Sequence, residues 1–331
     1  MEQVYANRDQ YGSVMEEKFQ LTKVSDTVLK GKYPLQPFEE GQRGTYGGEF
    51  ISQATLAAWE TIDNEEFSVH SLHAYFLKAG SEKSVMRYEV ETNSSGKNYI
   101  NKSVKVFQDH SNELVFILNC SFTRNNNIHD RKVQYANHET KRIPYEFQKD
   151  PHEFFADLKD KVKEGDGILE MTHTHDLVTH GLPLSYLQVD EEEYKTTATG
   201  DRKMGFFVKI NDKLPENNMK QKINVSNLLY LSDSVYLGCI TRSLGVPLAH
   251  KNTSFFRVSL DHSVFIHDND FNSTEWLFLD YTFPRMSNER VLCNCSVFDL
   301  NGKLIASINQ EALINLDKGL LDRTIGGTYK L

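Results

Sequence analysis

Hydrophobic positions along the chain predict two buried helices and two series of strands. Residues 49–62 are apolar on nearly every face of a helix, which is typical of a helix buried inside a domain. A second long apolar helix is predicted over 225–244. Strand-like runs are predicted over 69–77, 85–92, 99–108, 114–122, 184–189, 204–210, 255–267, 275–283, 291–298 and 304–314. A helix followed by long strands is typical of an α+β fold in which an antiparallel sheet wraps around the helix.

The order of these elements occurs twice. A shift of 190 residues places 69–122 on 259–312 without a gap. The shift matches three pairs of identical residues: Asp109 with Asp299, Leu114 with Leu304 and Asn119 with Asn309. We therefore predict an internal duplication, with an N-terminal domain over 1–130, an inserted linker over 131–181 and a C-terminal domain over 182–331. The polar residues over 1–20 predict a loosely held arm.

The composition of the 331-residue chain is that of a globular protein, with 39% hydrophobic residues. Its net charge of −9, from 37 basic and 46 acidic side chains, argues against a nucleic-acid partner, which would need a basic surface. No run approaches the roughly 18 consecutive apolar residues of a membrane helix, so stable membrane insertion is not expected. The first residues lack a secretory pattern. The four cysteines are expected to be free thiols in a reducing compartment.

Polar residues inside apolar elements are the candidates for chemistry. Asp233 shares a helical stripe with apolar residues, and a buried carboxylate is costly unless it has a role; the alternative is an exposed aspartate at a helix edge. Gln310 is the only polar residue on one face of the strand over 304–314, where it could instead cap the end of the strand. In the strand over 255–267, Ser259 shares a face with Asp261 and Ser263, and the spacing does not say which face is inward.

The duplication separates the two halves by their chemistry. Under the shift, Ser259 and Gln310 correspond to Val69 and Cys120, which are unsuited to polar catalysis. The second half is therefore predicted to be active and the first half to be structural.

Groups of metal-ligand residue types have the wrong spacing for a metal site. The histidine-rich group falls in the predicted linker and lacks the i, i+4 spacing of helical ligands; its members are His173, His175, Asp176 and His180. Cys293 and Cys295 are two residues apart and have no second cysteine pair. No metal and no cofactor are predicted.

Three segments resemble the type II acyl-CoA thioesterases, the double hot-dog family of bacteria and peroxisomes. The run Gly-Gly-Glu-Phe-Ile-Ser-Gln-Ala over 47–54, with 69–77, is similar to the first half of that family. Residues 259–267 are similar to its second-half strand, and 302–311 to its C-terminal hairpin. The resemblance implies a double hot-dog fold, in which two antiparallel sheets each wrap around a central helix. It also implies hydrolysis of a fatty acyl-CoA to free fatty acid and CoA.

The resemblance assigns three catalytic residues. The catalytic aspartate maps to Asp233, the catalytic threonine or serine to Ser259 and the catalytic glutamine to Gln310. Asp233 would act on a water as general base, and the other two would hold that water by hydrogen bonds. One alternative is an enoyl-CoA hydratase or dehydratase that uses Asp261 and His262. Another is a non-catalytic acyl-CoA binding protein.

The resemblance also implies a location and an assembly. The family's peroxisomal members suggest a peroxisomal protein, and the chain ends in Tyr329-Lys330-Leu331, similar to the Ser-Lys-Leu peroxisomal address. Tyr329 replaces the small residue usual in that address, so a cytoplasmic location is the alternative. A homo-oligomer is expected by analogy, because hot-dog sheets often associate through their edges.

Overall fold

The computed structural model describes residues 10–38, 43–124, 184–189, 203–234, 236–243 and 256–315. They fall into two compact units. The first unit takes its described residues from 1–135, 210–234 and 261–275; the second takes them from 136–209, 235–260 and 276–331. Each unit thus draws on both sequence halves, and the domain boundaries expected near 130 and 182 stay a prediction. The histidine-rich group of the linker and the last three residues lie outside the described residues.

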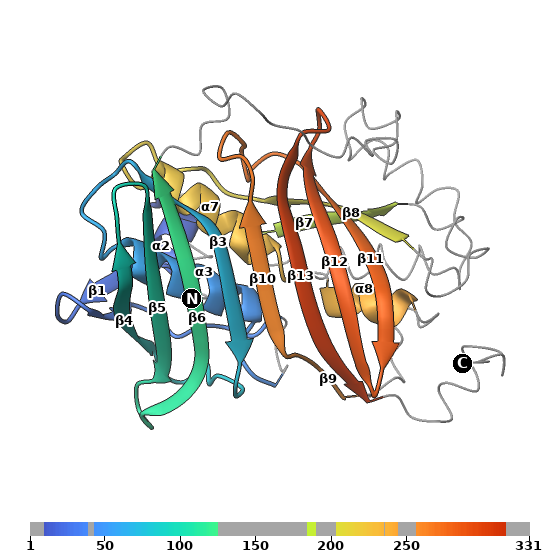
Figure 1. Cartoon of the computed structure of the whole chain (residues 1–331), viewed down its shortest axis with the longest axis horizontal. Helices are drawn as coiled ribbons and strands as arrows, with labels where there is room; N and C mark the ends of the chain where they lie inside the picture. The colour runs from blue at the N-terminus through green and yellow to red at the C-terminus, as the bar shows by residue number, and fades with distance from the viewer. Residues whose placement is uncertain are drawn as a thin grey trace. The chain divides into compact units, whose positions relative to one another are not determined.

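The first unit contains an antiparallel sheet with the strand order β1-β2-β4-β5-β6-β3-β10. Figure 1 shows β4, β5, β6, β3 and β10 side by side. The strands are β1 (Leu21–Lys23), β2 (Val28–Gly31), β3 (Phe67–Phe76), β4 (Met86–Ser95), β5 (Tyr99–Gln108), β6 (Glu113–Arg124) and β10 (Asp261–Ile266). The strand predicted over 99–108 is reproduced to the residue.

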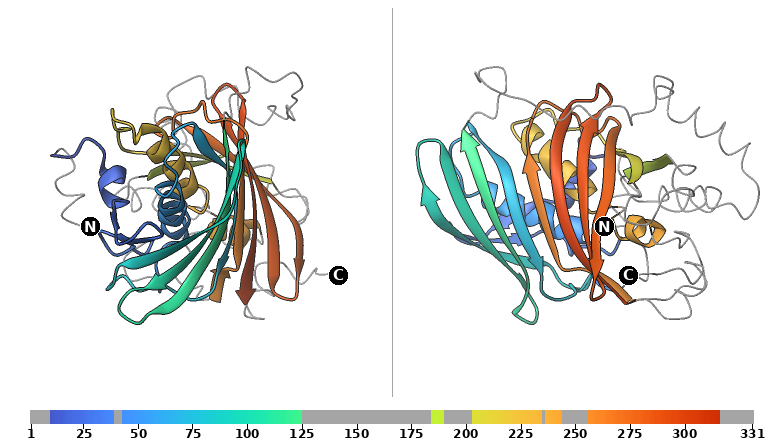
Figure 2. Two further views of the ribbon diagram at one scale, coloured as in Figure 1. Left: turned by 60° about the vertical axis from the view of Figure 1, so that its left-hand side comes forward. Right: turned by 45° about the vertical axis from the view of Figure 1, so that its right-hand side comes forward.

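Two helices pack together on one face of this sheet. Helix α3 (Gly47–Trp59) contacts β3, β4, β5 and β6, and it lies against α7 (Lys220–Leu231), as Figure 2 shows. Nearly every residue of α3 is buried, which agrees with its apolar sequence. The Ser52 hydroxyl donates to the Ser226 carbonyl at 2.8 Å, which fixes the two helices to each other.

The segment before the first sheet is packed, so the prediction of a loosely held arm is wrong over its described part. Helix α2 (Val14–Lys18) is capped by Ser13, whose hydroxyl also donates to Asp212 Oδ2 at 2.9 Å. Lys18 forms a buried ion pair with Glu49 of α3. Polar residues occur in this segment because they cap the helix and pair inside the unit, and not because the segment is solvated.

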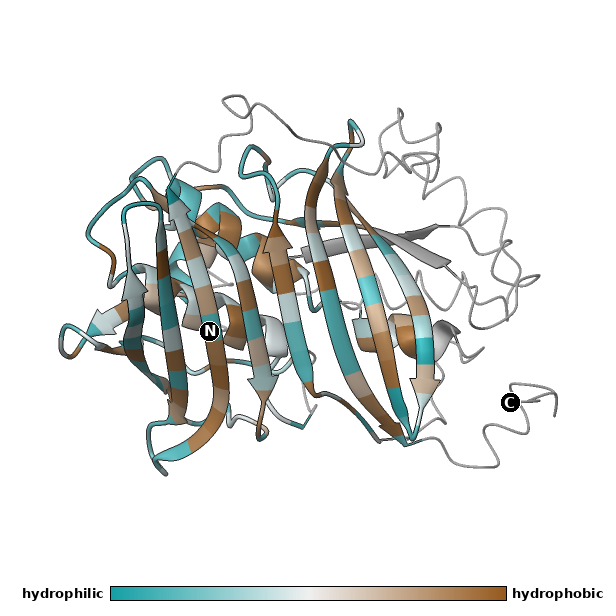
Figure 3. Ribbon diagram, in the orientation of Figure 1, coloured by the Kyte–Doolittle hydropathy of each residue, from teal (hydrophilic) through white to brown (hydrophobic). Residues whose placement is uncertain are grey.

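The second unit contains an antiparallel sheet with the order β13-β12-β11-β8-β7, and β9 pairs with β13. Helix α8 (Tyr236–Ser243) contacts β9 and β11. The strands are β7 (Leu184–Val189), β8 (Lys203–Ile210), β9 (Phe256–Ser259), β11 (Leu277–Ser287), β12 (Arg290–Asp299) and β13 (Leu304–Asn315). Apolar and polar positions alternate along β5 in the first unit and β13 in the second, which is the pattern from which these strands were predicted (Figure 3).

The helix predicted over 225–244 is two helices, because the chain turns between α7 and α8. The Ser232 hydroxyl donates to the Leu229 carbonyl, and the Ser234 hydroxyl donates to the Leu231 carbonyl, each at 2.7 Å. Serine hydroxyls that bond to nearby carbonyls compete with the helical pattern. The prediction of one continuous helix is therefore wrong at this point.

The strand predicted over 255–267 is also interrupted. Strand β9 ends at Ser259 and β10 begins at Asp261, with Leu260 between them. The interruption changes the phase of the alternation, so that Ser259 and His262 are buried while Asp261 is half-buried. The predicted face shared by Ser259, Asp261 and Ser263 is therefore wrong.

Among the helices of the described ranges, none is long and apolar enough to cross a membrane.

Candidate functional site

Two of the predicted site residues form a buried pair in the second unit. Strands β9 and β13 run antiparallel, with Ser259 opposite Ala312. The Gln310 amide Nε2 donates to Ser259 Oγ at 3.0 Å. Gln310 is 1% exposed and Ser259 is 9% exposed. Alternation along β13 buries Gln310 together with the apolar side chains on either side of it, as the sequence predicted.

The chemistry of this pair suits a bound water. A serine hydroxyl donates as well as accepts, and a glutamine amide has an acceptor oxygen besides its N–H donors. The two side chains together can therefore orient a small polar molecule by hydrogen bonds. A polar pair in a sheet core costs stability, because both groups lose their hydration.

Asp233 lies in the first unit, in the turn that follows α7. It is half-buried and lies in a turn, so the predicted place on a helical stripe is wrong, and its exposure lies between the buried carboxylate and the exposed aspartate that the sequence left open. Ser232 and Ser234, on either side of Asp233, bond back to α7 carbonyls. Ser232 Oγ also lies 2.9 Å from His262 Nε2, and both of these residues are buried. The turn that presents Asp233 is thus fixed on both sides.

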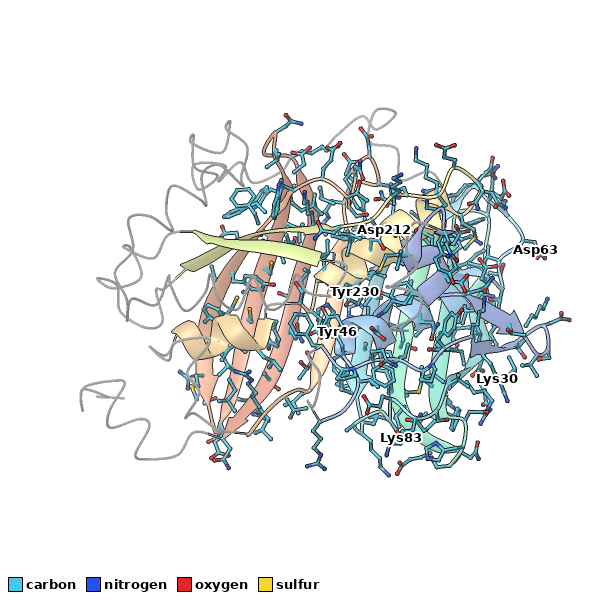
Figure 4. All side chains as sticks on the ribbon, turned by 180° about the vertical axis from the view of Figure 1, so that it is seen from behind. Lys30, Tyr46, Asp63, Lys83, Asp212 and Tyr230 are labelled. Atoms are coloured by element: carbon cyan, nitrogen blue, oxygen red, sulfur yellow. The ribbon has the colours of Figure 1, made fainter. Side chains whose placement is uncertain are left out.

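The start of α3 approaches this turn from the other direction. Tyr46 precedes α3, and its hydroxyl donates to the Tyr230 carbonyl of α7 at 2.5 Å. Their rings meet edge to face with centroids 4.8 Å apart (Figure 4). Burial, and next the negative charge of Asp233, raise the pKa of Tyr46 well above its usual value. The Tyr46 hydroxyl therefore stays protonated and continues to donate its hydrogen bond to the Tyr230 carbonyl near the end of α7.

The alternative pair, Asp261 and His262, is not brought together. The two residues are consecutive in β10, and neighbouring side chains of a strand point to opposite faces of the sheet. His262 is fully buried against Ser232, whereas Asp261 is half-buried opposite Tyr75 of β3. An acid–base pair made of these two side chains does not fit this geometry.

Sequence reasoning missed the residues that hold the Asp233 turn. The two serines on either side of Asp233 were a usable signal, because serine in an apolar helix often marks an interruption. The contact of Tyr46 with Tyr230 had no local signal, since the two residues are far apart in the sequence.

Metal-ligand residue types do not gather in the described part of the chain. No group of three or more histidine, cysteine or acidic side chains there could hold a metal ion. The four cysteines, all of them described, are free and buried: Cys120, Cys239, Cys293 and Cys295.

Two family descriptions match the chain, one for each half. The family described as "Acyl-CoA thioesterase N-terminal domain" matches residues 36–123, and "Acyl-CoA thioesterase C-terminal domain" matches residues 179–314. The chain is similar over most of its length to "Peroxisomal acyl-coenzyme A thioester hydrolase 1" of Saccharomyces cerevisiae. They are 26% identical over 346 residues, which cover 91% of this chain and 94% of the yeast protein. "Acyl-coenzyme A thioesterase 8" of Homo sapiens is 25% identical, and the match covers 89% of this chain and 87% of that one.

Solved structures support the fold. An acyl-CoA thioesterase II, TesB2, from Mycobacterium marinum has a TM-score of 0.63 at 22% identity, and covers 92% of this chain and 99% of its own. A conserved protein with a hot-dog fold from Alicyclobacillus acidocaldarius has a TM-score of 0.57 at 12% identity, and covers 92% of this chain and 98% of its own. The prediction of an α+β double hot-dog fold is confirmed.

Proposed function

This chain belongs to the acyl-CoA thioesterase family, and from that premise we propose that it hydrolyses fatty acyl-CoA to a free fatty acid and CoA with a water held by Ser259 and Gln310. The observation that carries the proposal is the buried 3.0 Å hydrogen bond from Gln310 Nε2 to Ser259 Oγ. Because apolar groups in place of both members of such a pair can be neutral or stabilising, its presence in a sheet core supports a functional reason for it. The proposed reaction needs neither a metal nor a cofactor.

In the proposed mechanism, Asp233 is the general base. It takes a proton from the water as the oxygen attacks the thioester carbonyl carbon. The C–S bond of the tetrahedral intermediate then breaks, and CoA leaves as the thiol with the proton that Asp233 took from the water, which restores the carboxylate. Ser259 and Gln310 orient the water before attack and limit its motion, which is the part of the barrier that positioning removes.

The test is release of free thiol by the full-length chain from short, medium and long acyl-CoA. We expect turnover by the native protein, and a decrease in kcat of about 10²- to 10⁴-fold in Asp233→Asn, the range for loss of a general base. Asp109→Asn is a matched control, because Asp109 pairs with Lys30 at the surface. Near-native turnover by Asp233→Asn would overturn the assignment of the base.

Two other outcomes would point to other functions. Addition of water to an enoyl-CoA with no release of thiol would indicate a hydratase. Saturable binding of acyl-CoA with no thiol released at any pH would indicate a binding protein.

We also propose that the protein is peroxisomal and homo-oligomeric. Support for the location is the peroxisomal name of the yeast relative. Fluorescence of an N-terminal fusion of the full chain tests the location, and a cytoplasmic signal would contradict it. Sedimentation of the purified chain tests the assembly, and a single monomeric species would contradict it.

A further inference from the structure

Helix α3 begins with two glycines, although glycine is unfavourable in a helix. A glycine costs roughly 1 kcal/mol relative to alanine in a helix interior, and every residue of α3 after Gly47 is buried. Gly47 and Gly48 lie where the start of α3 meets the end of α7 and the turn that carries Asp233. A requirement for close approach at this place explains why the helix begins with residues that lack a side chain.

The two glycines face different kinds of atom. A Cβ at Gly47 would lie 2.5 Å from Asp233 Oδ2 and 2.9 Å from the Phe76 ring. A Cβ at Gly48 would lie 2.5 Å from the backbone carbonyl oxygen of Tyr230. A carboxylate at the end of a side chain can move aside, whereas a helical carbonyl can move only with its helix. A side chain at position 47 would therefore displace the Asp233 carboxylate, whereas a side chain at position 48 would displace the backbone of α7.

We propose that Gly47 is a positioning residue for Asp233. Because glycine has no side chain, position 47 leaves the space that the Asp233 carboxylate occupies. The inference rests on the catalytic role proposed for Asp233. An added methyl group would push the carboxylate oxygen away by about 1 Å to reach ordinary contact, and a misplacement of about 1 Å can lower a rate about 10²-fold. The place of the carboxylate is also electrostatically favourable, because the first turn of a helix carries a partial positive charge.

The turn and the helix start hold this geometry from both sides. Ser232 and Ser234 fix the backbone of Asp233 to α7, and the Tyr46 hydroxyl joins the residue before α3 to the last turn of α7. Since the backbones on both sides are fixed, the side chains that must yield to a methyl group at position 47 are those of Phe76 and, where the contact is closest, Asp233.

The experiment measures kcat, KM and Tm for full-length Gly47→Ala, Asp233→Asn and the double variant. We expect Gly47→Ala to lower kcat about 10²-fold with KM little changed. In the Asp233→Asn background the same change should alter kcat by less than about threefold, because the group that it displaces is already inactive. Gly31→Ala is the matched control: its Cβ would lie 2.9 Å from the Gln53 amide, also the end of a polar side chain. We expect it to leave kcat unchanged.

The outcomes separate the catalytic role proposed for Asp233 from the positioning role proposed for Gly47. Near-native turnover by Asp233→Asn would remove the base assignment, and the role of Gly47 with it. Loss of activity in Asp233→Asn together with native kcat in Gly47→Ala would overturn the positioning role alone. An equal decrease in both backgrounds would show that Gly47 is merely structural. If Gly47→Ala does not fold, Gly47→Ala with Phe76→Leu relieves the contact with the ring and retains the contact with Asp233, and the same kcat comparison applies.

Discussion

The two sequence repeats have the same strand irregularity and different chemistry beside it. In the first repeat, the pairing of β3 with β6 shifts register between Val69 and Ser71, at His70. In the second, Leu260 separates β9 from β10, and it is 190 residues after His70. Asn112 and Gly302 are also 190 residues apart, and both have a positive φ, of 53° and 79°. The irregularities therefore belong to the repeat and not to the active half alone.

The side chains beside the irregularity carry the difference. Val69 lies opposite Phe122 in the first repeat, and Ser259 lies opposite Ala312 in the second. Where the first repeat has Cys120, the second has Gln310, which is bonded to Ser259. One backbone thus supports either an apolar core or a polar pair. Changes of side chain at equivalent positions, and not a new fold, distinguish the half proposed to be active.

Exchange of the second pair for the first should have the largest effect. Ser259→Val with Gln310→Cys gives the second repeat the residues of the first. We expect kcat to decrease about 10³-fold, since both groups that hold the water are lost, while Tm is unchanged or higher because the buried polar pair is gone. Thiol release and thermal unfolding measure the two quantities. A kcat within tenfold of native would show that the pair is structural.

Removal of one member of the pair should have a smaller effect. Gln310→Ala leaves Ser259 in place, and we expect kcat to decrease about 10²-fold, as for one lost hydrogen-bond donor in an active site. Asn309→Ala is the matched control, because its side chain is exposed on the neighbouring position of the same strand. Equal activity of Gln310→Ala and Asn309→Ala would contradict a functional role of Gln310.

The reverse exchange should change stability and not activity. Val69→Ser with Cys120→Gln puts polar groups into the apolar core of the first repeat, where both native side chains are buried. We expect the free energy of unfolding to decrease by about 2 kcal/mol and kcat to stay at the native value. Urea unfolding measures the first quantity. A large change in thiol release would contradict the structural role of the first repeat.

The smallest effect concerns pH at the irregularity itself. Burial lowers the pKa of His70, which contacts Ser121 Oγ at 2.9 Å and the Tyr99 ring. The unfolded chain, with a histidine pKa of about 6.5, therefore binds a proton more readily than the folded chain. Stability should be fully present above that pH and decrease as the pH falls below it. His70→Leu, which copies Leu260, should reduce the decrease in Tm between pH 7.5 and 5.5.

His267 also has a pKa lowered by burial, so part of the pH dependence should remain in His70→Leu. An identical pH dependence in the native chain and the variant would show that His70 does not contribute.

The alternation of apolar and polar residues within short segments predicted most of the fold and one residue of the proposed site. The strands over 99–108 and 184–189 were predicted to the residue, and Gln310 was placed on a buried face. Ser259 could not be oriented in this way, because the irregularity at Leu260 changes the phase. A period of two residues holds only where the strand is regular.

The surroundings of Asp233 could not be predicted from its own segment. Gly47 and Tyr46, which define them, are more than 180 residues earlier in the chain. The end of α7 before Asp233 was also missed, because apolar residues resume after Ser234 and continue into α8. Contacts with a distant segment decide the first feature, and the local bonds of Ser232 and Ser234 decide the second.

Chemical labelling of the four buried cysteines can report unfolding of the chain. Burial raises the pKa of all four thiols, and a thiol that is neutral and enclosed reacts slowly with alkylating reagents. A thiol-specific dye should therefore label intact molecules only as fast as they open. The same enclosure keeps the protein's own sulfur out of the colour reaction that counts released CoA, so that each dye equivalent formed during turnover corresponds to one thioester cleaved.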